Sequence, residues 1–198
     1  MKKYFLRLSI AISILLLLTS TVQAGEATDR IKTATDKLIE IVTNHDLDPP
    51  AMAAKRANMI METVNSIFDW TAFSQRALGR YWRTLNKTEK DEFVSLFGQL
   101  LQRTYMDKTR QYSGEKMNFI SEDTDGKYGV VKAEVALKSG ANIAVDFRVM
   151  KNKEKWYIYD VYVEGVSLVN NYRVQFNNIL TKSGYKELIS KLKAKLDS

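Results

Sequence analysis

The spacing of apolar residues changes twice along the chain, and these changes constrain the fold more than any other feature. From about residue 27 to residue 105 apolar residues recur every three or four positions, which predicts helices. Between residues 115 and 163 they alternate with polar residues, as in strands that bury one face. After Gly165 the helical spacing returns. Helices, then strands, then helices predict an α+β fold rather than alternating parallel units.

Capping signals mark where the helices are expected to begin. Helix starts are predicted at Ala27, Pro50, Asp69, Asn86, Ser167 and Ser183. The clearest signal is Asn86 with Glu89 three residues later, which has the spacing of a capping box. A glycine at position 79 is expected to end the short helix that Asp69 begins.

Four strands are predicted between the helical segments, over residues 115–122, 128–138, 141–150 and 156–163. The second and third alternate cleanly and are joined by Ser139-Gly140, which indicates a β-hairpin. In the fourth strand Ile158 is expected on one face and Val161 on the other, so that both faces are covered. The resulting antiparallel meander needs helices from both ends of the chain to cover its apolar face.

The first 24 residues have the three parts of a secretory signal. Positive charges precede an apolar run over residues 10–18, and Val22-Gln23-Ala24 supplies small residues where a signal peptidase cleaves. The run is shorter than the roughly 20 residues of a transmembrane helix. Cleavage after Ala24 is therefore expected, leaving residues 25–198 as a single domain.

Composition argues against several functional classes. The chain has no cysteine, so disulfides and thiolate chemistry are excluded, and its one histidine, His45, is expected at a solvated helix end rather than in a catalytic triad or metal site. Removing the three positive charges of the signal lowers the net charge from +7 to +4, which is short of a nucleic-acid binder. Charges near the fourth strand are interpreted as structural ion pairs among Asp160, Glu164, Arg148 and Arg173.

Three stretches have the order and spacing of a known family. They are residues 68–70 with 77–82; residues 92–93, 100–101 and 104–105 with 112–115; and residues 156–161, 164–169, 171–173 and 175–176. The third is the most specific, because it runs from a strand through a glycine turn into a capped helix. Together they resemble the MlaC-type periplasmic phospholipid-binding proteins, the toluene tolerance family. Residues 27–66 match only in general character.

The resemblance implies a curved antiparallel sheet of about four strands, covered by N- and C-terminal helices and enclosing an apolar lipid pocket. It also implies a periplasmic carrier that holds phospholipid by its acyl tails and maintains outer-membrane lipid asymmetry. Its implied partners are an inner-membrane ABC transporter complex and an outer-membrane lipoprotein complex. The protein is expected to be a monomer without enzymatic activity, cofactor, metal or nucleic-acid partner.

The apolar faces of the predicted elements are the candidate walls of that pocket. The residues expected to contact lipid are Phe73, Tyr81, Trp82, Phe93, Phe97, Leu101, Tyr105, Val131, Val135, Val145, Phe147, Val149, Val161, Val163, Val166, Leu168, Tyr172 and Phe176. Periodicity does not distinguish a hollow core from a filled one, so ordinary packing is the alternative for each. Arg76, Arg80 and Arg83 are expected to form a head-group rim or a partner surface, with a solvated face as the alternative.

Two other functions remain open from the residues alone. The first is a periplasmic adaptor with a solid core that acts only through protein partners. The second is an esterase or phospholipase that cleaves the lipid it holds. Bound lipid separates the carrier from the adaptor, and fatty-acid release separates it from the esterase.

Overall fold

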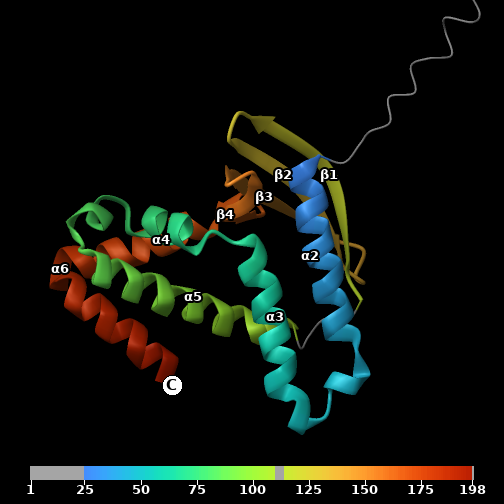
Figure 1. Cartoon of the computed structure of the whole chain (residues 1–198), viewed down its shortest axis with the longest axis horizontal. Coiled ribbons are helices and arrows are strands. Elements are labelled where there is room, and N and C mark those ends of the chain that lie inside the picture. The colour runs from blue at the N-terminus through green and yellow to red at the C-terminus, as the bar shows by residue number, and fades with distance from the viewer. Residues whose placement is uncertain (1–24, 110–113, 198) are drawn as a thin grey trace, which may run out of the picture.

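The computed structural model of the protein describes residues 25–109 and 114–197, without the side chains of residues 106–109. The predicted signal segment (1–24) and Tyr112-Ser113 of the second family stretch lie outside the described residues. Figure 1 shows the chain in two parts: a sheet accompanied by one N-terminal helix, and a group of helices beside it, with a further helix between them.

The order of elements confirms the predicted α+β fold. The helices are α2 (Glu26–Thr43), α3 (Ala53–Ile67), α4 (Trp70–Leu78), α5 (Lys87–Thr109) and α6 (Leu168–Asp197). Short 3-10 turns lie at His45–Leu47, Pro50–Met52 and Gly79–Thr84. The strands are β1 (Lys116–Asp125), β2 (Tyr128–Ala136), β3 (Asn142–Asn152), β4 (Lys155–Val163) and β5 (Val166–Ser167).

The predicted caps are confirmed where the structure shows their hydrogen bonds. The side chain of Asp69 accepts a hydrogen bond from the N–H group three residues on, at 2.8 Å. Asn86 and Glu89 form the reciprocal capping box, with bonds of 2.8 and 2.9 Å. Ser167 caps α6. A non-helical residue, Gly184 with φ 79°, bends α6 where two helices were predicted.

The sheet is antiparallel in the order β1-β2-β3-β4-β5, and the predicted hairpin joins β2 to β3. β5 adds a short strand to the four that were predicted. Glu164 and Gly165 both have positive φ, 50° and 75°, and form a tight turn that returns β5 alongside the end of β4. Two residues are too few to produce an alternating pattern, so this strand could not be predicted from periodicity.

A β-bulge in β4 corrects one prediction. Ile158 and Asp160 pair with adjacent residues of β3, which leaves Tyr159 as an extra, unpaired residue. The extra residue reverses the alternation of side chains along the strand. Val161 and Val163 therefore turn to the same face as Ile158. The prediction that they face opposite sides was wrong, because a period of two assumes an unbroken register.

Each part of the molecule has its own filled core. The inner face of the sheet packs against α2, and Ala27 and Ala34 of the helix share one buried core with Val131. The α4, α5 and α6 helices enclose an aromatic cluster in which the rings of Phe97 and Phe176 lie 5.0 Å apart in an edge-to-face arrangement. Any open interior space must therefore lie where the two parts meet.

Candidate functional site

An open apolar cavity of about 500 Å³ lies between the sheet and the helices. Its lining residues are Ile60, Met61, Val64, Phe68, Trp70, Phe73, Leu101, Gln102, Tyr105, Phe147, Val161, Val163, Val166, Ser167, Leu168 and Asn171. None of these residues carries a charge. Polar atoms come from the side chains of Gln102, Ser167 and Asn171, from the Tyr105 hydroxyl and from the Trp70 indole N–H. The cavity thus has the apolar lining and the size typical of small-molecule sites.

The β-bulge builds the sheet side of the cavity. Because Tyr159 shifts the register, Val161 lies opposite Phe147 on the inner face and Val163 follows on the same face. An unbroken strand would direct Val161 and Val163 outward and close off this wall. The bulge is therefore the local feature that carries the apolar face of β4 into the cavity.

The link between α3 and α4 forms a second wall. Phe68 makes an isolated parallel bridge with Ile158 of β4, and the N–H of Asp69 donates to the carbonyl of Ile158 at 2.9 Å. The rings of Phe68 and Trp70 stack with centroids 5.0 Å apart. These contacts tie the link to the sheet, so the two aromatic side chains have a defined position beside the cavity.

An amide side chain connects three helices beside the cavity. The Oδ1 atom of Asn65 in α3 accepts hydrogen bonds from Trp70 Nε1 of α4, at 2.7 Å, and from Gln102 Nε2 of α5, at 3.0 Å. Both bonds are exposed, and each contributes on the order of 1 kcal/mol. The link therefore holds α3 against α5 without making this wall rigid.

A buried carboxylate joins the sheet wall to the start of α6. Asp160 is 6% exposed, and it accepts hydrogen bonds from Ser167 Oγ at 2.6 Å, from the Val169 N–H at 3.0 Å and from the next N–H in the strand. A negative charge at a helix N-terminus is also favoured by the helix dipole. The prediction of an ion-pair network was wrong here: Asp160 serves as a cap, and Arg148 stacks over the ring of Tyr162 instead.

The cavity opens to solvent through an apolar mouth. Tyr105, Val163 and Val166 line the cavity and are 45%, 46% and 63% exposed. Burial raises the pKa of Tyr105, so its phenol stays neutral at physiological pH. Exposed apolar side chains gathered at one place are typical of an interaction site. The mouth therefore has the character of a surface at which an apolar ligand or partner binds.

Of the residues predicted to contact lipid, eight line the cavity: Phe73, Leu101, Tyr105, Phe147, Val161, Val163, Val166 and Leu168. The others lie in the two filled cores. The sheet residues that pack in the core with α2 are Val131, Val135, Val145 and Val149. The residues that belong to the helical core or pack against it are Tyr81, Trp82, Phe93, Phe97, Tyr172 and Phe176.

Sequence reasoning missed the contribution of α3 and of the link that follows it. The lining residues it did not name are Ile60, Met61, Val64, Phe68, Trp70, Gln102, Ser167 and Asn171. The apolar residues of α3 also pack with α2 in a small separate core around Ile41. A helix with apolar residues on more than one face needs a second packing partner. The breadth of the apolar surface of α3 was therefore the signal in the sequence that could have identified it as a cavity wall.

The three candidate rim arginines do not line the cavity. The guanidinium group of Arg76 lies 4.0 Å above the ring of Tyr159 and donates to the carbonyl of Ala72 at 3.1 Å. Arg80 lines a separate surface hollow of about 450 Å³ together with Arg173. Arg83 is exposed.

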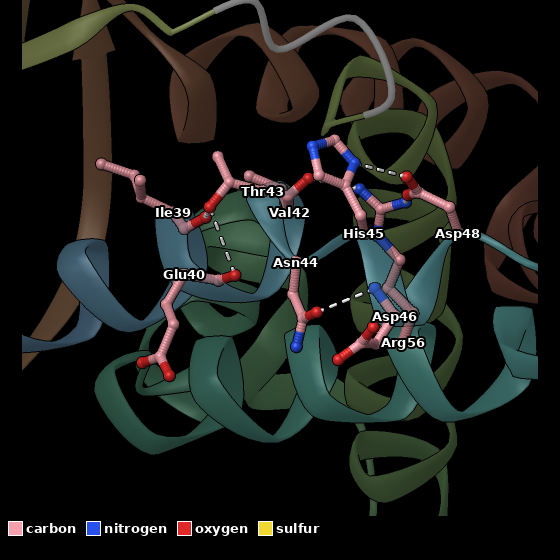
Figure 2. Close-up of polar contacts among 9 residues, drawn as sticks. All are labelled: Ile39, Glu40, Val42, Thr43, Asn44, His45, Asp46, Asp48 and Arg56. Carbon is pink, nitrogen blue, oxygen red and sulfur yellow. Dashed lines mark hydrogen bonds and ion pairs between the residues drawn. The ribbon is translucent and has the colours of Figure 1, made fainter.

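His45 lies at the turn between α2 and α3, which Figure 2 shows in close-up. Its Nδ1 atom is 2.9 Å from Asp48, which also pairs with Arg56 at 2.9 Å. The hydrogen bond with His45 helps to hold the pKa of Asp48 below its usual value. The His45 side chain is 94% exposed and does not line the cavity, as expected for a solvated helix end.

Neither a metal site nor a membrane span is found in the described part of the chain. Over residues 25–109 and 114–197, no three His, Cys, Asp or Glu side chains come together in a way that could hold a metal ion. Within the same residues no helix is long and apolar enough to cross a membrane.

Comparison with known proteins gives consistent matches. The chain is 24% identical to the intermembrane phospholipid transport system binding protein MlaC of Haemophilus influenzae, over 97% of this chain and 92% of that protein. The structure superposes with a TM-score of 0.77 on the phospholipid-binding protein from Ralstonia solanacearum, solved in complex with a phospholipid, at 24% identity over 87% of this chain and 98% of that one. The family model for the MlaC protein matches residues 32–194, and the chain therefore belongs to the MlaC family.

Proposed function

We propose that this protein is a phospholipid carrier that holds acyl tails in the cavity between its sheet and its helices. The observation that carries the proposal is an open cavity of about 500 Å³ whose described lining residues carry no charge, in a chain of the MlaC family. The names of its relatives support the ligand class, since one is an intermembrane phospholipid transport protein and another was solved with a phospholipid.

The energetics of acyl chains suit such a cavity. Each CH2 group that leaves water contributes about 0.8 kcal/mol, so a sixteen-carbon tail gains on the order of 10 kcal/mol on burial. An apolar cavity of about 150 Å³ holds a benzene ring. A cavity about three times larger therefore accommodates on the order of twenty carbon atoms, which is one tail and part of a second.

The lining also favours release, which a carrier needs as much as binding. None of the described lining residues holds the tails by a charge, and their few polar groups are amides, hydroxyls and one indole N–H. A phosphate buried against this wall would be costly to desolvate without a partner. The head group is therefore assigned to the solvent outside the mouth formed by Tyr105, Val163 and Val166.

We assign the contact with lipid to the cavity-lining residues defined above, including the eight that the sequence predicted. The sixteen residues make one predominantly apolar surface drawn from α3, the link that follows it, α4, α5, α6 and the sheet. Arg76, Arg80 and Arg83 are then candidates for a partner surface rather than for a head-group rim, because they lie outside the lining.

The proposed setting is the periplasm. The signal pattern in residues 1–24 supports export with cleavage after Ala24, and residues 25–198 act as one lipid-binding domain. The name of the Haemophilus relative supports exchange with membrane complexes. We propose an inner-membrane ABC transporter complex and an outer-membrane lipoprotein complex as those partners, with the apolar mouth as the transfer face. The protein itself carries out no covalent chemistry on the lipid.

Native mass spectrometry of the protein, purified from the cell envelope without detergent, tests the proposal. A mass increase that matches one phospholipid, lost at higher collision energy, is expected. A lipid-free mass after gentle handling would support the adaptor instead. Incubation with fluorescently labelled phospholipid should release no fatty acid, and release that survives repurification would identify a lipase.

A further inference from the structure

The first turn of α2 rests on a carboxylate from a distant strand. Glu122 of β1 accepts a hydrogen bond from the N–H of Thr28 at 2.7 Å. Thr28 is the third residue of α2, whose N–H group has no partner within the helix. The residue before the helix, Gly25, has no side chain that could cap it. Glu122 therefore supplies the missing capping acceptor from 94 residues away.

The lack of a side chain at Gly25 leaves space for Glu122, and the backbone conformation does not call for glycine. Its φ and ψ, −71° and 162°, are open to any residue. A β-carbon at Gly25, however, would overlap the carboxyl group of Glu122. Backbone bonds of about 1.5 Å then place the Gly25 nitrogen within about 5 Å of that carboxyl group. The Glu122 carboxylate thus lies close both to the first turn of the helix and to the nitrogen that precedes it.

The same nitrogen is the atom that signal cleavage would change. If the chain is cut after Ala24, as proposed above, the neutral amide of Gly25 becomes a positively charged α-amino group. A positive charge at a helix N-terminus is unfavourable, because the helix dipole places about half a positive charge there already. Glu26 and Asp29 also lie in this turn, but Glu26 pairs with Lys151 of β3.

We propose that Glu122 is the counter-ion of the α-amino group that cleavage creates at Gly25, so that processing of the precursor fastens α2 to β1. One side chain then satisfies both the helix N–H group and the new charge. The precursor has only the first of these interactions. Processing would in this way strengthen the docking of α2, which covers the inner face of the sheet.

A double-mutant cycle on the mature chain tests the proposal. Chains that begin at Gly25 or at Gln23 are prepared with and without Glu122→Gln, and unfolding in urea is compared at low salt. We expect the two extra residues to raise the unfolding equilibrium constant about two- to fivefold when Glu122 is present, and to leave it unchanged or lower it in the Glu122→Gln chains, where the α-amino charge has lost its counter-ion. The difference should shrink in 1 M NaCl.

Two controls separate this role from others. Asp123→Asn removes the neighbouring carboxylate of β1 and should leave the effect of the extension unchanged. If Glu122→Gln folds poorly, hydrogen exchange of the Thr28 amide in the two parent chains gives the same answer, with slower exchange expected in the chain that begins at Gly25.

Equal effects of the extension with and without Glu122, or equal exchange of the Thr28 amide in the two parent chains, would overturn the proposal. N-terminal sequencing of exported protein that finds a first residue other than Gly25 would also overturn it. Phospholipid content is measured separately on each chain. A failure of the counter-ion proposal can therefore be distinguished from a failure of the proposed carrier function.

Discussion

A carboxylate in the cavity wall should convert phospholipid binding into a pH-dependent process. Val161 is suited to this test because it is half-buried, lines the cavity and lies opposite Phe147. In the lipid-free protein a Val161→Glu side chain can remain hydrated, since the cavity is open to solvent. In the loaded protein it would face hydrocarbon, and none of the lining residues that the structure describes offers a positive charge to pair with it.

The size of the expected loss of lipid affinity follows from protonation of the new glutamate, which is the least costly way to accommodate this side chain beside hydrocarbon. Keeping a glutamate neutral at pH 7 costs about 3.7 kcal/mol, or about 500-fold in affinity. The bound state favours the neutral acid, so binding raises the pKa of this carboxyl and takes up a proton. Affinity should therefore recover about tenfold for each pH unit of acidification, until the acid is neutral in the free protein as well.

The assay measures displacement of a fluorescent phospholipid at pH 7 and pH 5, with co-purified lipid quantified by mass spectrometry. Val161→Gln should weaken binding without the pH dependence. Val130→Glu, which is half-buried on β2 but outside the lining, should bind as the parent does. A folded Val161→Glu protein with parental lipid content at pH 7 would refute the reasoning.

Four further perturbations have defined outcomes. Asp160→Asn should lower the free energy of unfolding by about 2 kcal/mol in urea denaturation, because an amide cannot accept all three hydrogen bonds at the start of α6; an unchanged midpoint would show that α6 is held by other contacts. Asn86→Ala should cost about 1 kcal/mol through loss of the capping box, seen as a lower Tm. Burial, followed by the charges of Glu92 and Glu89, raises the pKa of Tyr185 to about 12. The contribution of the neutral Tyr185 phenol to the free energy of unfolding should be complete below the ordinary pKa of tyrosine and be lost as the pH rises through 12. An ultraviolet titration in which Tyr185→Phe removes no late-titrating phenol would contradict this. Asn65→Leu should speed lipid loss to acceptor vesicles by freeing α3 from α5, and an unchanged rate would exclude that link as a barrier.

Local sequence signals predicted those parts of the fold that depend on a few neighbouring residues. The capping box of Asn86 and Glu89, the cap at Asp69 and the β2–β3 hairpin all follow from spacing within a short window. The bulge at Tyr159 has no such signature. It depends on how β4 pairs with β3, and it decides which face Val161 and Val163 occupy.

The candidate site could be predicted only in part, because periodicity reports burial and not what covers a residue. Val131 and Val161 both lie on the inner face of the sheet, yet Val131 is buried in the core that it shares with Ala27 and Ala34 of α2. No residue that the structure describes fills the cavity in front of Val161. Similarly, the stripe of α5 places Phe97 in the filled core and Leu101, one turn later, at the cavity. Such differences depend on how helices cross the sheet.

The crystal structure of protein exported by its own cell and purified without detergent tests the central claim most directly. The account predicts continuous acyl-chain density in contact with Leu101, Phe147 and Val161, with the head group beyond Val163 and Val166. Side chains that close this space completely, or lipid bound only on another face of the molecule, would contradict it.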